Sequence, residues 1–542
     1  MLITLNNKMN NKSSRCMFAL LFITLTCVLI LFYTSRLYTA WESNETKLLY
    51  REINRKRDSI INTRLELWRE QQESDDAPTL RLMKDAMLFK QLMSYHAAKL
   101  INPKLKDLDF FRRIANSLQD TMASHIEHIY SNTSQKNVRK LKHLDEIAVS
   151  TIQATQNPPN CTTAKKLFCD LKERCGNGCT LHHYSICFFA AIGTGRIMLW
   201  DLSNYPGLSK VIQNPSPCQS MSDINAAKNA PEWRSSNMPD PTPTSTPVVK
   251  YTKGNKPVKF TRFAPYTVPS HLLEDIKLVH AEPDLWWMGH VMSYLVRPND
   301  WLLKEIEKTK TEIGFQHPVV GIQVRRTDKI REAPYQSVDT YMDYVSSWYD
   351  RYDMEHDNVK RRVFVASDEP SVFTEAKSKY PDYIFLHLPT NEAKISNDGT
   401  TNFFMDVFLL RECDYIAVTF SSNVGRLVHE LRQTSGKDAT FGTANLDFSF
   451  YANGMWPLVY EAVLAHHPPE PCELPGDMDW EKQKDYEGIC EMTFEVGDKI
   501  ESVPLLTRGI LIGGKNVGTG KAGMFPANKA KPILESAPYN VV

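Results

Sequence analysis

The sequence has 542 residues, of which 42% are hydrophobic and 23% are charged. This composition excludes an intrinsically disordered chain and is sufficient for a large buried core in roughly two or three structural units. Sixty-four Lys and Arg residues nearly balance 63 Asp and Glu residues, which leaves a formal net charge of +1. The sequence therefore gives no support for a nucleic-acid partner bound through bulk electrostatics, and any basic binding site has to be local.

The N-terminal segment predicts a membrane anchor. Residues 16–33, CMFALLFITLTCVLILFY, carry no charge over 18 positions, which is just long enough to cross a bilayer as a helix. Lys8, Lys12 and Arg15 precede this run, so the positive-inside rule places residues 1–15 in the cytosol and the rest of the chain in the lumen. A cleaved signal peptide is the alternative, but its apolar core is shorter and a small-residue cleavage site follows it. We expect a signal anchor over residues 16–35 of a single-pass type II membrane protein.

Residues 36–155 are predicted to form a helical stalk. Ile53, Ile60 and Leu67 recur every seven residues among charged side chains, which is the spacing of a coiled coil. Apolar residues between positions 111 and 129 then recur at intervals of three and four. We expect a homodimer that is held together by this stalk. The alternative is that each helix packs on its own domain, because so short a heptad run does not exclude it.

Six cysteines crowd into the 58 residues between positions 161 and 218. They are Cys161, Cys169, Cys175, Cys179, Cys187 and Cys218. An even number of cysteines in an oxidising compartment predicts disulfide bonds. The alternative is a zinc site built from Cys175 and Cys179 with the neighbouring His182 and His183. The Cys-x3-Cys spacing matches such a site only loosely, and the compartment disfavours free thiolates.

After residue 310 the chain repeats one unit of strand, polar turn and helix. The first strand is HPVVGIQV (317–324) before RRTDK, the second is RRVFVAS (361–367) before DEPS, and the third is YIAVTF (415–420) before SSN. Apolar strands that alternate with helices predict a parallel sheet covered on both faces. In such sheets the carboxyl ends of the strands meet at one edge, where helix N-termini offer unpaired N–H groups to anions. The three polar turns are therefore predicted to face one crevice.

The first of these turns indicates an anion site. Arg325 and Arg326 end an apolar strand, and a guanidinium holds phosphate oxygens bidentately with a charge that does not titrate. A diphosphate fits this pattern, and a structural Arg–Asp pair is the alternative. No P-loop motif is present, no Gly-x-Gly-x-x-Gly run separates a strand from a helix, and no Asp-x-Asp pair stands at a strand end. We therefore expect arginines rather than a metal to neutralise the diphosphate, and we predict no metal and no other cofactor.

Several stretches together resemble one family. HPVVGIQVRRTDK, ASDEPS, FFMDVFLL and VTFSSNVGR, with the six cysteines and the pair Trp286-Trp287, closely resemble the core α1,6-fucosyltransferases of the Golgi. The resemblance runs from the anchor to the C-terminus and implies a GT-B-like, Rossmann-type parallel-sheet catalytic domain over residues 160–460. It implies GDP-fucose as the donor and the innermost, asparagine-linked GlcNAc of N-glycoproteins as the acceptor. The reaction would form an α1,6 linkage with inversion and without a metal, in the lumen at the Golgi membrane.

The same resemblance assigns the residues of the site. Arg325 and Arg326 would hold the diphosphate and stabilise the charge that builds up on it. Glu332 would accept the proton of the acceptor hydroxyl, with Lys329 and Asp328 positioning or relaying. The donor pocket would also be lined by Tyr341, Asp368, Glu369, Ser422 and Asn423. The implied disulfides are Cys161–Cys218, Cys169–Cys187 and Cys175–Cys179.

Two further residues are predicted to select guanine. Asp406 lies in the apolar run FFMDVFLL, where a carboxylate is costly unless it finds donors. The resemblance places it against the N1–H and 2-amino groups of guanine, and the alternative is a helix residue that faces solvent or caps a neighbour. Gln323 stands where the family usually has a histidine, and its amide N–H would donate to guanine O6 instead.

Other positions depart from the family's pattern. The turn after RRTDK is one residue shorter, which makes Glu332 the best match to the family's catalytic glutamate and leaves its reach open. Val418 and Gly425 occupy the places of a cysteine pair that flanks the TFSS turn in the family. Cys472 and Cys490 are additional cysteines, and a bridge between them would join the linker to the C-terminal domain.

Residues 461–535 are predicted to contain a linker and an SH3-like β-barrel, which the family carries. MTFEVGDKIESV (492–503) and KAGMFPANKAKPI (521–533) resemble the second-strand and Gly-x-Phe-Pro-x-Asn portions of that fold. No pair of tryptophans precedes Gly509, and Lys529 replaces the usual tyrosine, so the aromatic walls that bind a polyproline helix are missing. We expect a structural or acceptor-shaping barrel, with peptide recognition as the alternative.

Two other functions stay open at the level of the sequence. One is a fucosyltransferase that acts on protein or on another glycan, because arginine-rich strand ends occur across that broader group. The other is a non-catalytic lumenal adaptor that works through the stalk and the barrel. Acceptor choice distinguishes the first from core fucosylation, and donor hydrolysis or transfer excludes the second.

Overall fold

The structure is a computed structural model, and it describes residues 135–171, 175–233, 246–252, 262–327, 333, 335–353, 356, 358–389, 399–447, 450, 458–468, 471, 474–475, 490–508 and 511–539. All of these belong to one compact unit that spans residues 76–542. The predicted anchor, the heptads of the predicted stalk, and Asp328, Lys329 and Glu332 lie outside the described residues. Within the described ranges no helix is both long enough and apolar enough to cross a membrane.

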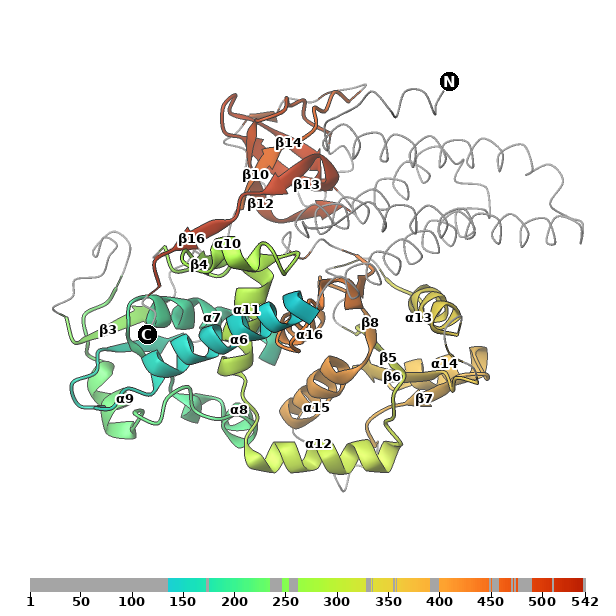
Figure 1. The fold of residues 1–542 in the computed structure, drawn as a ribbon, viewed down its shortest axis with the longest axis horizontal. Helices are drawn as coiled ribbons and strands as arrows, with labels where there is room; N and C mark the ends of the chain where they lie inside the picture. Colours follow the sequence, from blue (N-terminus) through green and yellow to red (C-terminus); the bar gives the residue numbers. More distant parts are fainter. Residues whose placement is uncertain are drawn as a thin grey trace, which may run out of the picture. The chain divides into compact units, whose positions relative to one another are not determined.

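A five-stranded parallel sheet organises the chain after residue 318 (Figure 1). Its strands are β5 (Val319–Val324), β6 (Arg362–Ser367), β7 (Ile384–Leu386), β8 (Tyr415–Val418) and β9 (Thr443–Asn445). Their order across the sheet is β7-β6-β5-β8-β9, and all four pairings are parallel. Every residue of β5 and β8 is buried, as expected for strands covered on both faces.

Helices cover both faces of this sheet. α13 (Val338–Tyr352) and α14 (Ser371–Lys379) share a core with Val320, Ile322 and Val324 of β5. α15 (Gly399–Glu412) and α16 (Asn423–Arg432) share the other core with Val319. Because side chains alternate along a strand, β5 contributes to both cores. The predicted parallel sheet of strand, turn and helix units is confirmed.

The strand order identifies a switch point. Counted along the chain from β5, the order across the sheet is third, second, first, fourth, fifth, so the direction of winding reverses between β5 and β8. In doubly wound sheets ligands bind beyond the carboxyl ends of the strands at this reversal. The residues that leave the two strands there are Arg325 after β5 and Thr419 after β8.

A second parallel sheet, in the order β2-β1-β3, organises the preceding half. Its strands are β1 (Lys166–Asp170), β2 (Ile197–Leu199) and β3 (Val248–Thr252). The other elements there are α6 (Gln135–Gln156), α7 (Asn177–Gly193), α8 (Pro206–Val211), α9 (Met221–Ala227), β4 (Thr267–Pro269), α10 (Leu273–Ile276), α11 (Pro283–Leu295) and α12 (Asp300–Ile313). Two parallel α/β sheets fit the predicted α/β catalytic domain.

The helix α6, at the end of the predicted stalk, packs on the α/β core. Leu141, Leu144 and Ile152 are buried in that core. Asp145 accepts a hydrogen bond from the indole N–H of Trp286 in α11 at 2.8 Å. The alternative in which a helix packs on its own domain therefore describes α6, whereas the stalk before residue 135 lies outside the described residues.

An antiparallel sheet follows, with the strand order β11-β14-β13-β12-β10-β15. The strands are β10 (Val459–Ala462), β11 (Leu474–Pro475), β12 (Lys499–Arg508), β13 (Leu511–Asn516), β14 (Lys521–Pro526) and β15 (Ala530–Pro532). Tyr460, Phe494 and Phe525 belong to its own apolar core. The ammonium of Lys529 donates to the carbonyl of Ala465 at 3.2 Å, so a polar contact occupies the place of the missing tyrosine. That this sheet is an SH3-like barrel stays a prediction.

After this sheet the chain returns to the α/β half. β16 (Glu535–Ala537) pairs in parallel with β4. The Tyr539 ring then lies 5.2 Å from the ring of Trp287 and 4.9 Å from that of Phe263, centroid to centroid. Ala537 and Tyr539 are buried in the main core. The core of the α/β half thus includes residues that precede the antiparallel sheet in the sequence and residues that follow it.

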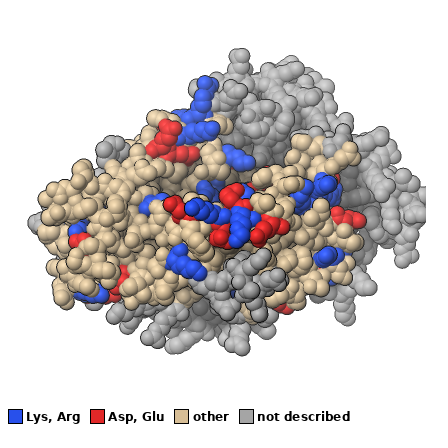
Figure 2. All heavy atoms as spheres, turned by 90° about the horizontal axis from the view of Figure 1, so that it is seen from below, with Lys and Arg blue, Asp and Glu red and all other residues tan. Residues whose placement is uncertain are grey.

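Charges of both signs are mixed on the face of the molecule that Figure 2 shows. Figure 2 shows basic and acidic side chains next to one another on the face seen from below. On α12, Lys308 pairs with Glu305 at 3.2 Å, and Lys310 pairs with Glu307 at 3.1 Å and with Glu412 at 2.6 Å. Neighbouring charges of opposite sign largely cancel at a distance, so this face offers no strong field of one sign for a polyanion.

Candidate active site

One carboxylate ties the end of β5 to the end of β6. Asp368, which follows β6, accepts a hydrogen bond from Nη1 of Arg325 at 2.7 Å and from the backbone N–H of Arg326 at 3.0 Å. The hydroxyl of Thr327 also donates to it. The Arg325 side chain keeps 31% of its surface exposed, so solvent and small molecules reach its guanidinium. This arrangement orients a charged donor at the switch point of the sheet.

Arg326 has different surroundings. Its Nη1 donates to the carboxylate of Glu375 on α14 at 2.9 Å, and its guanidinium lies 5.0 Å from the ring centroid of Tyr335. Only 7% of its side chain is exposed. The Nε and Nη2 atoms are buried and have no hydrogen-bond partner among the described residues. Of the two predicted phosphate ligands, Arg325 is therefore the one that a ligand reaches more readily.

The turn after β8 leads into a capped helix. Ser422 is the N-cap of α16, and its hydroxyl accepts the N–H of the second helical residue at 3.3 Å. Asp447 accepts the backbone N–H groups of Phe420 at 2.8 Å and Ser421 at 3.2 Å. Asn445 also accepts from Phe420, at 3.1 Å. Asn445 and Asp447 were not predicted, because β9 (Thr443–Asn445) has one apolar residue among three and gives little sequence signal of a strand.

Tyr341 in α13 and Glu369 in the turn between β6 and α14 contact the same edge of the sheet. Tyr341 in α13 is 1% exposed, and burial raises the pKa of its phenol. Its side chain is hydrogen-bonded to Thr419, so it joins α13 to the β8 turn. Glu369 accepts the hydroxyl of Ser371, at the start of α14. Both predicted pocket residues thus hold the turns around the crevice through contacts with protein groups.

Asp406 and Gln323 lie between α15 and β5, displaced to a similar extent toward the carboxyl edge of the sheet. A Cβ added to Gly321 of β5 would lie 2.7 Å from Leu410 of α15, so the two are packed together. Asp406 lies one helical turn before Leu410 on the same helix face, and Gln323 lies two residues after Gly321 on the same strand face. Only two residues separate the end of α15 from the start of β8, so the N-terminus of α15 is toward the carboxyl edge. Asp406 therefore lies about 6 Å along the helix from Leu410, and Gln323 lies about 7 Å along the strand from Gly321, both toward that edge.

This pair has unsatisfied polar atoms. Desolvation by the surrounding protein raises the pKa of the Asp406 carboxyl well above its ordinary value. No residue in the described part of the chain donates a hydrogen bond to that carboxyl group. The Oε1 atom of Gln323 is buried and likewise has no partner among the described residues. Buried polar atoms without partners and strongly shifted carboxyl groups are more common at binding sites than in structural cores.

The remaining predicted site residues are only partly described. Asn423 is the first residue of α16 and is half-buried. Asp328, Lys329 and Glu332 belong to the turn after Thr327, outside the described residues. The described members of the predicted donor site therefore gather at the carboxyl edge of one sheet, and the assignment of the proton acceptor stays a prediction.

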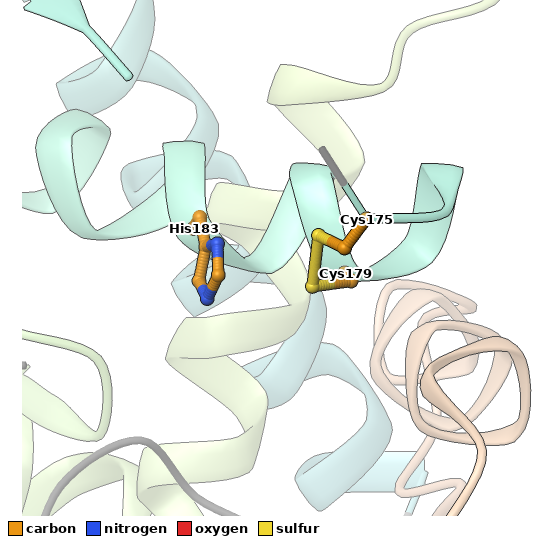
Figure 3. Close-up of side chains that lie close together, drawn as sticks. All are labelled: Cys175, Cys179 and His183. Carbon is orange, nitrogen blue, oxygen red and sulfur yellow. A yellow bond between two sulfur atoms is a disulfide. The ribbon is translucent and has the colours of Figure 1, made fainter. Parts of the chain in front are cut away.

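The predicted disulfides are confirmed. They are Cys161–Cys218, Cys169–Cys187 and Cys175–Cys179. Within the described ranges, one group of residues is close enough to hold a metal ion, and it consists of Cys175, Cys179 and His183. Figure 3 shows that the two sulfur atoms are bonded to each other beside the His183 ring. Zinc binds thiolates, so the disulfide excludes the zinc alternative for this pair.

Cys490 also forms a disulfide. Its partner lies outside the described residues, because the other described cysteines form the three named pairs or, for Cys413, stay free. The proposed bridge to Cys472 is compatible with this observation and is not tested by it. Val418 and Gly425, which replace the family's cysteine pair, are in contact, since a Cβ on Gly425 would lie 3.1 Å from Cβ of Val418.

A doubly wound parallel sheet with an accessible arginine, a capped helix N-terminus and a desolvated carboxylate at its switch point is the architecture of a nucleotide-binding α/β protein. Comparison with known families makes the class more specific. The chain belongs to the alpha-(1,6)-fucosyltransferase family, because the family described as "Alpha-(1,6)-fucosyltransferase N- and catalytic domains" matches residues 37–451.

Individual relatives agree with the family match. The chain is 29% identical over 410 residues to an alpha-(1,6)-fucosyltransferase of Drosophila melanogaster, which covers 74% of this chain and 62% of that protein. It is 30% identical over 394 residues to an alpha-(1,6)-fucosyltransferase of Caenorhabditis elegans, which covers 70% of this chain and 66% of that protein. The chain thus spans slightly less than two thirds of the length of these relatives.

Similarity to solved structures is more distant. A mutant of Arabidopsis thaliana FUT1 in complex with GDP is 16% identical, with a TM-score of 0.33. The match covers 55% of this chain and 77% of that one. A TM-score of this size does not establish a shared fold.

Proposed function

We propose that this chain transfers fucose from GDP-fucose, in α1,6 linkage and with inversion, to the innermost, asparagine-linked GlcNAc of N-glycans. The observation that carries the proposal is an accessible arginine at the switch point of a parallel sheet, within the region that matches the fucosyltransferase family. An arginine there suits a leaving group that is a nucleoside diphosphate.

Arg325 has the central part in this scheme. The 6-hydroxyl oxygen of the acceptor attacks fucose C1, the bond from C1 to the β-phosphate oxygen breaks, and its electron pair goes to the diphosphate. Arg325, oriented by Asp368 at 2.7 Å, stabilises that negative charge. The N-terminus of α16 adds a partial positive charge at the same edge. Removal of one such donor typically costs about 3–4 kcal/mol of transition-state stabilisation.

In this scheme no metal neutralises the leaving diphosphate. The acceptor's 6-hydroxyl group also has to lose its proton to a base. Glu332 accepts the proton of the 6-hydroxyl, and Asp328 and Lys329 position it or relay the proton. Inversion follows from a single displacement in which the acceptor attacks from the face opposite to the diphosphate. Arg326, whose guanidinium is paired with Glu375, supports the turn that carries these groups.

Guanine selection is assigned to Asp406 and Gln323. The carboxylate of Asp406 accepts the N1–H and 2-amino groups of guanine, two parallel donors that adenine lacks. The Gln323 amide donates to guanine O6. Support comes from the placement of the two side chains on facing surfaces of α15 and β5, and from the Asp406 carboxyl group, to which no described residue donates a hydrogen bond.

The cellular arrangement is part of the proposal. A single anchor at residues 16–35 holds the protein in the Golgi membrane with the catalytic part in the lumen. The segment before residue 135 acts as a stalk that joins two copies, and residues 461–535 hold the linker and the SH3-like barrel. Three disulfides among the described residues support a lumenal location, because such bonds persist in oxidising compartments.

One assay tests the reaction and its alternatives. The purified protein is incubated with GDP-fucose in three separate reactions. The first contains a biantennary N-glycan that exposes terminal GlcNAc, the second an unglycosylated folded domain, and the third no acceptor. Mass-spectrometric fragmentation locates the added fucose, and NMR of the product gives its linkage and anomeric configuration. Transfer to the innermost GlcNAc alone supports core fucosylation. Transfer to the folded domain supports protein fucosylation, and absence of both transfer and donor hydrolysis supports the adaptor.

A further inference from the structure

A small disulfide-closed loop contacts both helices that carry the proposed donor ligands. The loop runs from Cys175 to Cys179 and opens α7. A Cβ added to Gly178 would lie 2.9 Å from Cβ of Asn423, the first residue of α16. Nδ2 of Asn177 donates to the hydroxyl of Thr400, the second residue of α15, at 3.3 Å. One loop therefore touches the N-terminal turns of α15 and α16.

His182, one turn after Gly178 in α7, forms a buried pair with Glu430 of α16. Nδ1 of His182 donates to the carbonyl oxygen of Gly178 at 2.7 Å, because a carbonyl only accepts. Nε2 of the same ring lies 3.1 Å from both carboxylate oxygens of Glu430. His182 is 6% exposed and Glu430 is 0% exposed. Separating the two side chains would leave a buried polar group without its partner, which is costly. The pair therefore fixes the position of α7 along α16.

The loop has little freedom to move. The disulfide joins residues separated by four positions in the sequence, which restricts the backbone between them. Gly178 belongs to α7, and its helical backbone conformation is one that any residue adopts. The absence of a side chain is therefore needed for the close approach to Asn423 and not for the backbone angles.

The geometry points to the Cys175–Cys179 loop as a positioning element of the donor site. Gly178 and Asn177 set where α16 and α15 begin, and thereby where Ser422, Asn423 and Asp406 stand at the carboxyl edge of the nucleotide-binding sheet. The inference rests on the proposed function. Because α7 follows β1 of the other parallel sheet, donor affinity in this protein depends on an element outside the sheet that binds the donor.

Two alanine substitutions in the same loop test the inference. In Gly178→Ala the new Cβ pushes against Asn423, and we expect the Kd for GDP to rise about tenfold, with KM for GDP-fucose rising by a similar factor and kcat changing less. Gly176→Ala is the matched control, because nothing lies within 4 Å of its added Cβ and its φ of −63° suits alanine. Its Kd and KM should equal those of the wild type. Calorimetric titration with GDP and steady-state kinetics on the full chain measure these values, and thermal melts check folding.

The outcomes separate the inference from the proposed function. If the wild type does not bind GDP, the proposed function fails. If the wild type binds GDP and Gly178→Ala binds it equally well, the positioning inference is overturned. Should Gly178→Ala not fold, Asn177→Ala decides, because it removes only the contact with Thr400. We then expect a rise in Kd of about threefold, and an unchanged Kd overturns the inference.

Discussion

Replacement of Asp406 by asparagine is expected to weaken GDP binding severely. Asparagine matches aspartate in shape, so the packing of α15 is preserved. In the proposed complex the carboxylate accepts two parallel donors of guanine, whereas an amide accepts one and turns its own N–H₂ group toward the other. A buried donor without an acceptor costs about 1–3 kcal/mol, and hydrogen bonds to a charged acceptor are stronger than those to a neutral one. We expect a loss of at least about 2 kcal/mol, which is about a 30-fold rise in Kd.

The same substitution is expected to stabilise the free protein near neutral pH. Desolvation raises the pKa of the Asp406 carboxyl well above its ordinary value, so the folded state favours the protonated form. Such a group contributes stability that is fully present below the unfolded pKa, about 4 for aspartate, and is lost as pH rises through the folded pKa. Asparagine does not titrate. The Tm of Asp406→Asn minus that of the wild type should therefore increase as pH is raised from about 4 to about 8.

Two measurements check this double effect. Calorimetric titration with GDP and with ADP gives the affinity and the base preference, and thermal melts across the pH range give the stability difference. Asp382→Asn makes the same chemical change at an exposed position and serves as the control. GDP affinity equal to wild type in Asp406→Asn, or ADP binding as tight as GDP binding in the wild type, would refute the guanine assignment. A Tm difference that does not vary with pH would refute the desolvation argument.

Three further substitutions give separate tests. Arg325→Ala should abolish fucose transfer with little change in Tm, because the side chain is 31% exposed, and a variant that keeps more than about a tenth of the wild-type rate would count against its role. Gln323→Ala should weaken GDP binding by about 1 kcal/mol in the same titration, and no change at all would remove it from the guanine contact. Gly425→Ala should lower the Tm, because its Cβ would lie 2.5 Å from the carbonyl oxygen of Thr419, whereas Gly399→Ala has nothing within 4 Å. Equal Tm values for these two glycine variants would contradict the contact.

Three strands of the parallel sheet were predictable from the sequence because most of their residues are apolar. VVGIQV and YIAV are buried on both faces, and such strands occur in sheets that helices cover on both sides. The convergence of the polar turns then follows from the geometry of parallel strands. The disulfide pairing was not predictable in this way, since six cysteines allow 15 pairings. It came from the resemblance to a family, and the structure confirms it.

The surroundings of the site residues depend on contacts that no local pattern encodes. Arg325 and Arg326 are identical in type, yet Glu375 and Tyr335 cover the second while the first stays accessible. The partner that holds the Cys175–Cys179 loop, Glu430, is 248 residues away from His182 in the sequence. A single sequence carries no signal for a contact at that separation. The same limit explains why α6 was assigned to the stalk rather than to the α/β core.

The pairing of β16 with β4 has a consequence for how the chain matures. Thr267 in β4 and Glu535 in β16 are 268 residues apart, and their side chains are hydrogen-bonded at 3.4 Å. A ribosome that adds about 5–20 residues per second needs roughly 15–50 s to make the intervening chain. During that interval the rings of Trp287 and Phe263 lack Tyr539, and apolar surface of this kind binds chaperones or aggregates. The nascent protein therefore passes through a stage in which its five-stranded parallel sheet has been synthesised but the neighbouring core is unfinished, and translation that stops before residue 535 leaves it there.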